Sequence, residues 1–350
     1  MTFARPSFRH PDLPRNKIGF TRVDYDGALS TLCAGCGHDS ITSAIIQACF
    51  ELSLAPHRIA KLSGIGCSSK TPAYFLGNSH GFNAVHGRMP AVATGAVMAN
   101  RELTYIGISG DGDTASIGMG QFVHAVRRNL DITYITMNNG VYGLTKGQDS
   151  ATADLGSASR KGIPNPFAPI DLCANAIQLG AGYVGRSFSG DKAQLVPMLK
   201  AALAHKGFSF VDVISPCVTF NNSARSTKSY ASMRENMRAT EMFDFVPARD
   251  EITVTYAEGD FTNVTMHDGS VIQLHKGDGN LNVQSRRSAL AALEDYRHDG
   301  KILTGLLYID AESQDLHKIL NTSLTSLNAL NEQELCPGSA VLQQINQSLR

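Results

Sequence analysis

The chain has 350 residues, which is enough for one large or two moderate domains, each with its own hydrophobic core. Its 31 Lys and Arg residues balance its 31 Asp and Glu residues, so no overall charge favours binding to nucleic acid or to an anionic membrane. No apolar run approaches the roughly 20 residues that span a bilayer, and residues 1–17 contain no apolar signal core, so we expect a cytoplasmic protein. Seven cysteines in such a compartment favour metal binding, catalysis or burial over disulfides.

Helical and extended patterns alternate along residues 38–216. Helical spacing of apolar residues, or proline at a helix start, predicts helices at 38–52, 89–102, 117–129 and 191–205. Short apolar runs predict strands at 58–65, 103–110, 131–138 and 208–215. This alternation predicts an α/β fold with a doubly wound, mainly parallel sheet, in which ligands bind beyond the carboxyl ends of the strands.

The pattern changes after about residue 240. Further elements are predicted as strands at 251–260 and 262–276, the latter with a hairpin turn at Asp268-Gly269, then a helix at 286–297, a strand at 301–310 and a helix at 315–321. We therefore expect an amino-terminal extension over 1–30, a main domain over 31–240 and a small α+β carboxyl-terminal extension over 241–350 that contacts a partner subunit. Residues 144–170 lack a clear period, which is typical of a functional loop.

Four cysteines form one C-x2-C pair and two distant single positions: Cys33, Cys36, Cys67 and Cys217. Each lies where a predicted strand ends or a helix begins, so the four can converge at one edge of the sheet. Four thiolates suit tetrahedral zinc or a cubane iron-sulfur cluster, whereas C-x2-C alone suits a redox dithiol. In a fourth alternative, the two single cysteines are ordinary core residues. The spacing leaves these alternatives open.

The other three cysteines, Cys49, Cys173 and Cys336, lie in apolar or terminal settings. We interpret them as inert packing thiols, because free cysteine behaves as a small apolar residue.

A small-residue segment around Asp111 follows a predicted strand and precedes a helix. Glycine lets the backbone approach a phosphate there, and the carboxylate provides a hard oxygen ligand for Mg2+. Asn139 closes the next predicted strand and could give its side-chain carbonyl to the same ion. The tripeptide Gly110-Asp111-Gly112 recurs as Gly277-Asp278-Gly279, and the pair Asn138-Asn139 recurs as Asn221-Asn222. We interpret both repeats as lacking this context.

The segment SGDGDTASIGMGQFVHAVRRNLDITYITMNNGVYG resembles the thiamine diphosphate motif, in which GDG and a following NN bracket the Mg-diphosphate. With CAGCGHDSI, GIGCSSK, HGR, YGLTKGQ and SPCV, in that order, the chain resembles the beta subunit of 2-oxoacid:ferredoxin oxidoreductases over roughly residues 30–225.

The resemblance implies three resident cofactors. One [4Fe-4S] cluster would be held by Cys33, Cys36, Cys67 and Cys217. Magnesium would be held by Asp111, the side chain of Asn139 and the backbone carbonyl of Val141. Thiamine diphosphate would be bound by Ile65, Gly66, Cys67, Ser68, His86, Gly110, Gly112, Asp113, Asn138, Gly143 and Leu144. The candidate catalytic residues are His86, Lys70 and Lys146. The two lysines are candidates for binding substrate carboxylates, and we expect the Lys146 ammonium to be buried.

The implied reaction is oxidative decarboxylation of a 2-oxoacid with coenzyme A, with single electrons passing through the cluster to ferredoxin. Lys146 suits a second carboxylate, which favours 2-oxoglutarate over pyruvate or a branched-chain 2-oxoacid. A zinc-stabilised, non-catalytic scaffold subunit is a lower alternative. The chain shows no second α/β unit to carry the glutamate that activates the cofactor, so we expect an alpha subunit, in a dimer of heterodimers.

Overall fold

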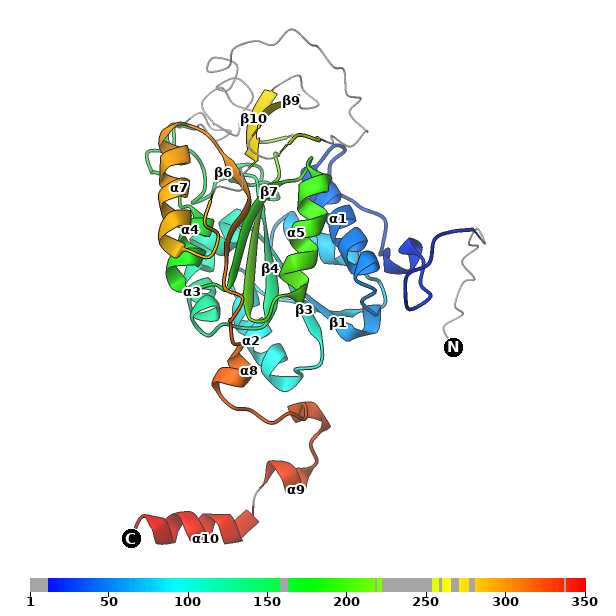
Figure 1. Ribbon diagram of the computed structural model, residues 1–350, viewed down its shortest axis with the longest axis vertical. Helices are drawn as coiled ribbons and strands as arrows, with labels where there is room; N and C mark the ends of the chain where they lie inside the picture. The colour runs from blue at the N-terminus through cyan, green and yellow to red at the C-terminus, as the bar shows by residue number, and fades with distance from the viewer. Residues whose placement is uncertain are drawn as a thin grey trace.

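The computed structural model describes residues 12–157, 163–217, 219–221, 254–257, 260–265, 271–276, 281–336 and 338–350. Its main feature is one nine-stranded sheet, in the order β2-β1-β3-β4-β8-β7-β11-β10-β9 (Figure 1). The strands are β1 Ile59–Ser63, β2 His80–Asn83, β3 Thr104–Gly110, β4 Ile132–Asn138, β7 Tyr183–Phe188, β8 Phe208–Ile214, β9 Phe261–Thr265, β10 Val271–Lys276 and β11 Leu303–Ile309. A separate small hairpin pairs β5 Val141–Tyr142 with β6 Gln148–Asp149.

The first six strands of this order are all mutually parallel. Strand β11 then pairs antiparallel with β7, while β10 is parallel to β11 and β9 is antiparallel to β10. The predicted α/β fold with a mainly parallel sheet is therefore confirmed. The carboxyl ends of β1, β3, β4 and β8 point the same way and form one edge of the sheet.

Helices cover both faces of the sheet (Figure 1). One face carries α1 Gly37–Glu51 and α5 Lys192–Ala204; the other carries α2 Met89–Ala99, α3 Met119–Arg127, α4 Leu172–Leu179 and α7 Arg286–His298. The remaining helical elements are η1 Arg22–Tyr25, η2 Pro56–Arg58, η3 Ser68–Ala73, η4 Asp113–Ile117, α8 Leu316–Ile319, η5 Leu327–Ala329, α9 Glu332–Leu335 and α10 Gly338–Ser348. Burial of an apolar layer on each face is the main force that holds the helices to the sheet.

Aromatic packing fixes α3 on its face. The ring of Phe122 meets Tyr134 edge-on with centroids 5.4 Å apart, and meets Phe208 and Phe210 at 5.8 and 5.2 Å. Such pairs contribute about 0.5–1.5 kcal/mol beyond the burial of their area. They hold α3, and the turn before it that carries Asp113, against the strands β4 and β8.

The carboxyl-terminal elements join the main sheet. Strand β11 pairs with β7 from Gly305 to Ile309, and α7 packs beside α4. The expected boundary near residue 240 therefore does not separate two sheets. After α8 the chain runs away from the sheet, and all described side chains of α10 are exposed (Figure 1).

Most predicted elements occur within two residues of their expected ends. The helix expected at 117–129 begins at Met119, because residues 113–117 form a π-helical turn that ends at Gly118. Strands β9 and β10 form the predicted antiparallel pair, while the Asp268-Gly269 turn lies outside the described residues. Residues 254–257 are not a strand, and the rest of the strand expected at 251–260 is described only at Asp260, which is not a strand residue either.

Several described elements had no sequence prediction, among them the sheet strands β2 and β7, the hairpin strands β5 and β6, and the helices α4, α9 and α10. Strand β2 is exposed along its whole length and has no apolar run. Across the described residues, no helix combines the length and apolar character that crossing a membrane requires.

Candidate functional site

Polar side chains from neighbouring strand ends meet at the carboxyl edge of the sheet. Asp111 follows β3 and Asn139 follows β4, and the backbone N–H of Asn139 donates to Oδ1 of Asp111 at 3.2 Å. The structure thus brings together the two residues that the sequence predicted as Mg2+ ligands.

Asp111 is buried and almost saturated with hydrogen bonds. The hydroxyls of Ser150 and Thr152 both donate to its Oδ2, the latter at 2.6 Å. A carboxylate offers about four lone-pair positions, and three donors are in place, so one position on Oδ1 is left for a metal ion. The donor set fits a hard cation that takes oxygen ligands.

Asn139 is held by two further contacts. Its Oδ1 accepts the N–H of Val141 at 3.1 Å, and its backbone carbonyl accepts Nδ2 of Asn221 at 2.8 Å. Asn221 is buried at this site, so its interpretation as a residue without a site context is wrong. The repeat at Gly277-Asp278-Gly279 and the position of Asn222 lie outside the described residues.

Asp113 acts as a clamp for the loop that carries His86. Its Oδ1 accepts the N–H of Gly87 at 2.8 Å, and its Oδ2 accepts the hydroxyl of Ser109 at 2.9 Å. A Cβ atom on Gly64 would lie only 1.9 Å from Oδ2, so glycine is required for this approach. His86 itself is exposed beside this clamp.

Small residues leave space for a ligand next to Asp111. The hydroxyl of Ser68 is buried and has no hydrogen-bond partner among the described residues, and a Cβ on Gly110 would lie 3.1 Å from it. Gly66 has a φ of +113° and no atom within 4 Å of its Cβ position. A buried hydroxyl without a partner is costly, so a ligand that binds Ser68 fits this place.

Gly112 is in contact with the ring of Tyr142. The Tyr142 hydroxyl donates to the Gly112 carbonyl at 3.0 Å, and a Cβ on Gly112 would lie 2.5 Å from the ring. The carboxamide of Asn138 lies among other side chains: its Nδ2 donates to Asp212 at 3.1 Å, and its Oδ1 lies 3.1 Å from Oγ1 of Thr152. The predicted contact of Asn138 with the cofactor stays a prediction.

We predict that Gly112→Ala destabilises the protein, because the methyl group must displace the Tyr142 ring. Overpacking of this kind costs about 1–3 kcal/mol. Gly120→Ala in α3 is the matched control, since its Cβ would meet nothing within 4 Å; it should instead stabilise the helix by about 0.5–1 kcal/mol. Thermal unfolding of both variants checks this, and equal midpoints would contradict it.

The four cysteines of the proposed cluster converge. A Cβ on Gly143 would lie 3.4 Å from Sγ of Cys67 and 3.8 Å from Sγ of Cys217, so these sulfur atoms approach one point. The hydroxyl of Thr219 donates to Sγ of Cys33 at 3.7 Å, which places Cys33 beside the segment after β8.

Electrostatics connect the same four thiols. Burial, together with the smaller effects of the charges of Cys217 and Cys67, raises the pKa of Cys36 to about 12. Burial also raises the pKa of Cys67, and so do Cys217 and Cys33, while Lys70 opposes the shift. Four mutually repelling thiolates need compensating positive charge, as iron or another metal provides.

The start of α1 explains how the C-x2-C pair reaches the strand ends. A Cβ on Gly37 would lie 2.6 Å from the hydroxyls of both Ser189 and Ser215, which follow β7 and β8. Nδ1 of His38 is 2.7 Å from Oγ of Ser215, and burial lowers the His38 pKa to about 4. This close approach places Cys36 next to Cys217.

Among the described residues, no group of three or more Cys, His, Asp or Glu side chains is arranged so that it could hold a metal ion. Of the remaining cysteines, Cys49 and Cys173 are buried as predicted, whereas Cys336 is exposed and is not a packing thiol.

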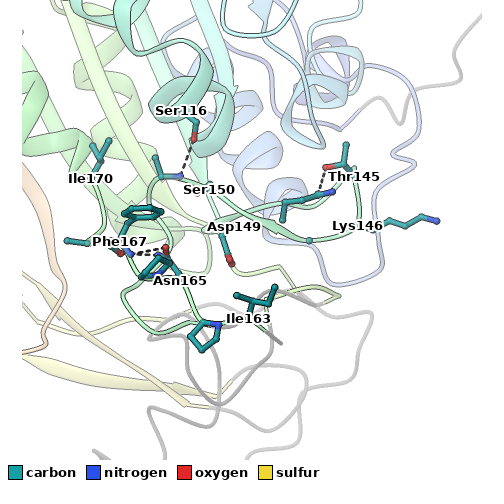
Figure 2. Close-up of a pocket in the computed structure, with 15 residues that line it drawn as sticks. Ser116, Thr145, Lys146, Asp149, Ser150, Ile163, Asn165, Phe167 and Ile170 are labelled. Carbon is teal, nitrogen blue, oxygen red and sulfur yellow. Dashed lines mark hydrogen bonds between the residues drawn. The ribbon is translucent and has the colours of Figure 1, made fainter. Parts of the chain in front are cut away.

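A cavity of about 860 Å³ is lined in part by residues 145–151 and 163–168 (Figure 2). Ser150 both lines it and contacts Asp111, and the apolar part of its lining includes Ile163 and Phe167. Burial raises the pKa of Asp149, whose side chain also lines the cavity.

The two predicted substrate lysines lie in different surroundings. Lys70 is half-buried and close enough to Cys67 to lower the pKa of that thiol. Lys146 is exposed, has a φ of +79°, and extends away from the other cavity residues (Figure 2). The expectation of a buried Lys146 ammonium is therefore wrong for this chain alone. Leu144 is also exposed.

Comparison with known proteins identifies the family. A family model described as thiamine pyrophosphate enzyme, C-terminal TPP binding domain, matches residues 64–213. The 2-oxoacid:ferredoxin oxidoreductase subunit beta of Saccharolobus solfataricus is 43% identical over 204 residues, which cover 58% of this chain and 66% of the relative. The 2-oxoglutarate synthase subunit KorB of Methanocaldococcus jannaschii is 35% identical over 256 residues, which cover 70% and 91%.

A third relative, the 2-oxoglutarate oxidoreductase subunit KorB of Mycobacterium tuberculosis, is 39% identical over 55% of this chain and 51% of its own length. The chain thus spans about half to two thirds of several relatives that it matches. A solved structure, 2-oxoglutarate:ferredoxin oxidoreductase from Magnetococcus marinus with 2-oxoglutarate, coenzyme A and succinyl-CoA bound, has a TM-score of 0.71 and 28% identity. The match covers 88% of this chain and 91% of the chain in the solved structure.

The chain contains a thiamine diphosphate-binding domain. It belongs to the family of beta subunits of 2-oxoacid:ferredoxin oxidoreductases.

Proposed function

We propose that this chain is the thiamine diphosphate-binding subunit of an enzyme that converts 2-oxoglutarate and coenzyme A to succinyl-CoA and CO2. Two electrons leave the substrate and pass one at a time to ferredoxin. The observation that carries the proposal is the meeting of the Asp111–Asn139 oxygen set and the four-cysteine group at one sheet edge, with Gly143 beside both Cys67 and Cys217. Thiamine diphosphate, when bound, supplies the carbanion chemistry; the protein binds, orients and provides the electron exit.

The cofactor assignments rest on this chain's own donor groups. Asp111, Asn139 and the carbonyl of Val141 would hold Mg2+ beside the diphosphate, while Ser68 and the backbone at Gly66 and Gly112 would contact the cofactor. The four cysteines would hold one [4Fe-4S] cluster. Cys67, which would bind the cluster, directly precedes Ser68, which would contact the cofactor, so one segment of the chain would serve both groups.

The partner proposals follow from what one such subunit needs. An alpha subunit would bring the activating glutamate and complete the coenzyme A site. The assembly would contain two alpha and two beta chains, and the enzyme would act in the cytoplasm. Exposed apolar side chains after α8 support a subunit contact in the region 241–350: Leu335, Val341, Leu342 and Ile345.

The substrate proposal is supported by the relatives named for 2-oxoglutarate and by the solved structure that binds it. Pyruvate and branched-chain 2-oxoacids are the alternatives. In the test, the chain is co-purified with its alpha subunit without oxygen and assayed with each 2-oxoacid, coenzyme A and ferredoxin. We expect the highest kcat/KM for 2-oxoglutarate, and a brown protein; a colourless zinc protein with no activity would overturn the proposal.

A specific prediction concerns Lys146, which can bind the distal carboxylate of 2-oxoglutarate only when the alpha subunit covers it. A charge-assisted hydrogen bond contributes about 1.5–3 kcal/mol. Lys146→Met should therefore lower kcat/KM for 2-oxoglutarate roughly 10- to 150-fold and leave pyruvate turnover nearly unchanged. Steady-state kinetics with both substrates provide the measurement.

Two controls separate charge from loop structure. Lys146→Gly suits the φ of +79° and should show the same selectivity as Lys146→Met. Lys70→Met should affect both substrates, because they share the carboxylate next to the 2-oxo group. If Lys146→Met depresses both substrates equally, the lysine does not recognise the distal carboxylate.

A further inference from the structure

A chain of buried polar side chains connects the proposed metal site to the start of α4. It begins at Asp111, whose Oδ2 accepts the Thr152 hydroxyl at 2.6 Å. Oγ1 of Thr152 also lies 3.1 Å from Oδ1 of Asn138, and Nδ2 of Asn138 donates to Oδ1 of Asp212 at 3.1 Å. All four side chains are nearly inaccessible to solvent.

Arg186 on β7 completes the chain by bridging two carboxylates. Its Nε donates to Oδ2 of Asp212 at 3.0 Å, and its Nη2 donates to Oδ1 of Asp171 at 2.7 Å. Asp171 also caps α4, because its Oδ1 accepts the N–H of Ala174 at 3.0 Å. The planar guanidinium can serve both acids at once, which an ammonium on a flexible stem does less well.

The network has an excess of negative charge. Its carboxylates are Asp111, Asp212 and Asp171, and its cation is Arg186. A buried net charge of this kind is costly unless it is compensated. A divalent cation bound by Asp111 would neutralise it, so the network is electrostatically matched to Mg2+ at the position proposed above.

The same network holds both ends of a cavity-lining segment. At the first end Ser150 and Thr152 bind Asp111, and at the second end Asp171 binds Arg186. The two ends also bind each other, since the N–H of Ile170 donates to the carbonyl of Ala151 at 2.8 Å. Both ends of the segment therefore belong to the same polar network as Asp111.

We propose that Thr152 and Arg186 are positioning residues for the Mg-diphosphate site, which orient Asp111 and couple metal binding to the order of the cavity wall. The proposal rests on the proposed function, because it requires that thiamine diphosphate and Mg2+ bind at Asp111. Thr152 acts directly on the carboxylate, whereas Arg186 acts through Asp212 and Asn138.

The test uses the chain assembled with its alpha subunit and two measurements. Calorimetry gives the Mg2+ concentration that half-saturates thiamine diphosphate binding, and hydrogen exchange reports on residues 144–157 and 163–170. In the wild type we expect Mg-thiamine diphosphate to slow exchange in these residues. Thr152→Val keeps the shape but loses the hydroxyl, so the half-saturating Mg2+ concentration should rise roughly 10-fold or more and the slowing should disappear.

Conservative and matched variants complete the design. Thr152→Ser should recover both readouts, and Thr133→Val, which loses a buried hydroxyl bond to the Ala202 carbonyl, should behave as wild type. Arg186→Lys should shift both readouts in the same direction as Thr152→Val, whereas Arg58→Lys, in an exposed ion pair with Glu102, should not.

The outcomes are separable. Wild-type Mg2+ dependence and wild-type exchange in both Thr152→Val and Arg186→Lys would overturn the coupling, while the proposed function would stand. Failure of the wild-type enzyme itself to bind thiamine diphosphate would overturn the proposed function and this inference with it.

Discussion

Replacing Asp111 with alanine is expected to abolish Mg-dependent binding of thiamine diphosphate. The carboxylate is 1% exposed and offers Oδ1 to a cation, so its loss removes the main charge that would hold Mg2+. We expect affinity to fall at least about 100-fold, which corresponds to about 2.7 kcal/mol or more. Calorimetry on the assembled enzyme gives the affinity, and the iron and sulfide contents should stay close to wild type because the cysteines are untouched.

Two further variants test whether the lost affinity comes from the missing charge or from unfolding of the protein. Asp111→Asn keeps the shape and most hydrogen-bond acceptance for Ser150, Thr152 and Asn139 but removes the charge, so it should fold and still bind the cofactor poorly. Asp299→Ala removes an exposed carboxylate at the end of α7 and should bind normally. Equal affinity in Asp111→Asn and Asp299→Ala would show that Asp111 does not hold the metal.

Cys217→Ser is expected to remove or destabilise the proposed iron-sulfur cluster. A hydroxyl is a harder and poorer ligand for iron than a thiolate, and Cys217 approaches the same point as Cys67 from the end of β8. Iron and sulfide per chain should fall well below the wild-type values, and the paramagnetic signal of the reduced protein should be lost or altered.

The exposed thiol Cys336 provides the control for this substitution. Cys336→Ser should leave the metal content and the spectrum unchanged. If Cys217→Ser also keeps wild-type iron, sulfide and resonance signal, then Cys217 is not a ligand and the four-cysteine assignment fails.

Much of the fold was predictable from the sequence because its signals are local. Alternating helical and extended patterns determine that β1, β3, β4 and β8 are parallel, and parallel strands bring their carboxyl ends to one edge. From that alone, Asp111 and Asn139 were expected to meet, and they do. The approach of the four cysteines to one another was likewise predictable from the positions of the strand ends.

The elements that were missed, or placed differently, depend on pairing between distant segments. Nothing local in residues 303–309 says that β11 pairs antiparallel with β7 and extends the main sheet. The exposed strand β2 is likewise defined by its neighbour β1 and not by its own composition. Sheet pairing is a long-range property, so it cannot be obtained from periodicity within one strand.

The sequence by itself determined the family, the layered α/β architecture and the residues that carry the proposed chemistry, because short motifs at strand ends record them directly. Only the tertiary structure decided what surrounds those residues. Thr152 reaches Asp111 across 41 positions and Asn221 reaches Asn139 across 82, while Arg186 joins two carboxylates from different elements. The sequence shows that a polar residue needs hydrogen-bond partners if it is buried. Which residues become its partners depends on packing, and packing is defined only by the tertiary structure.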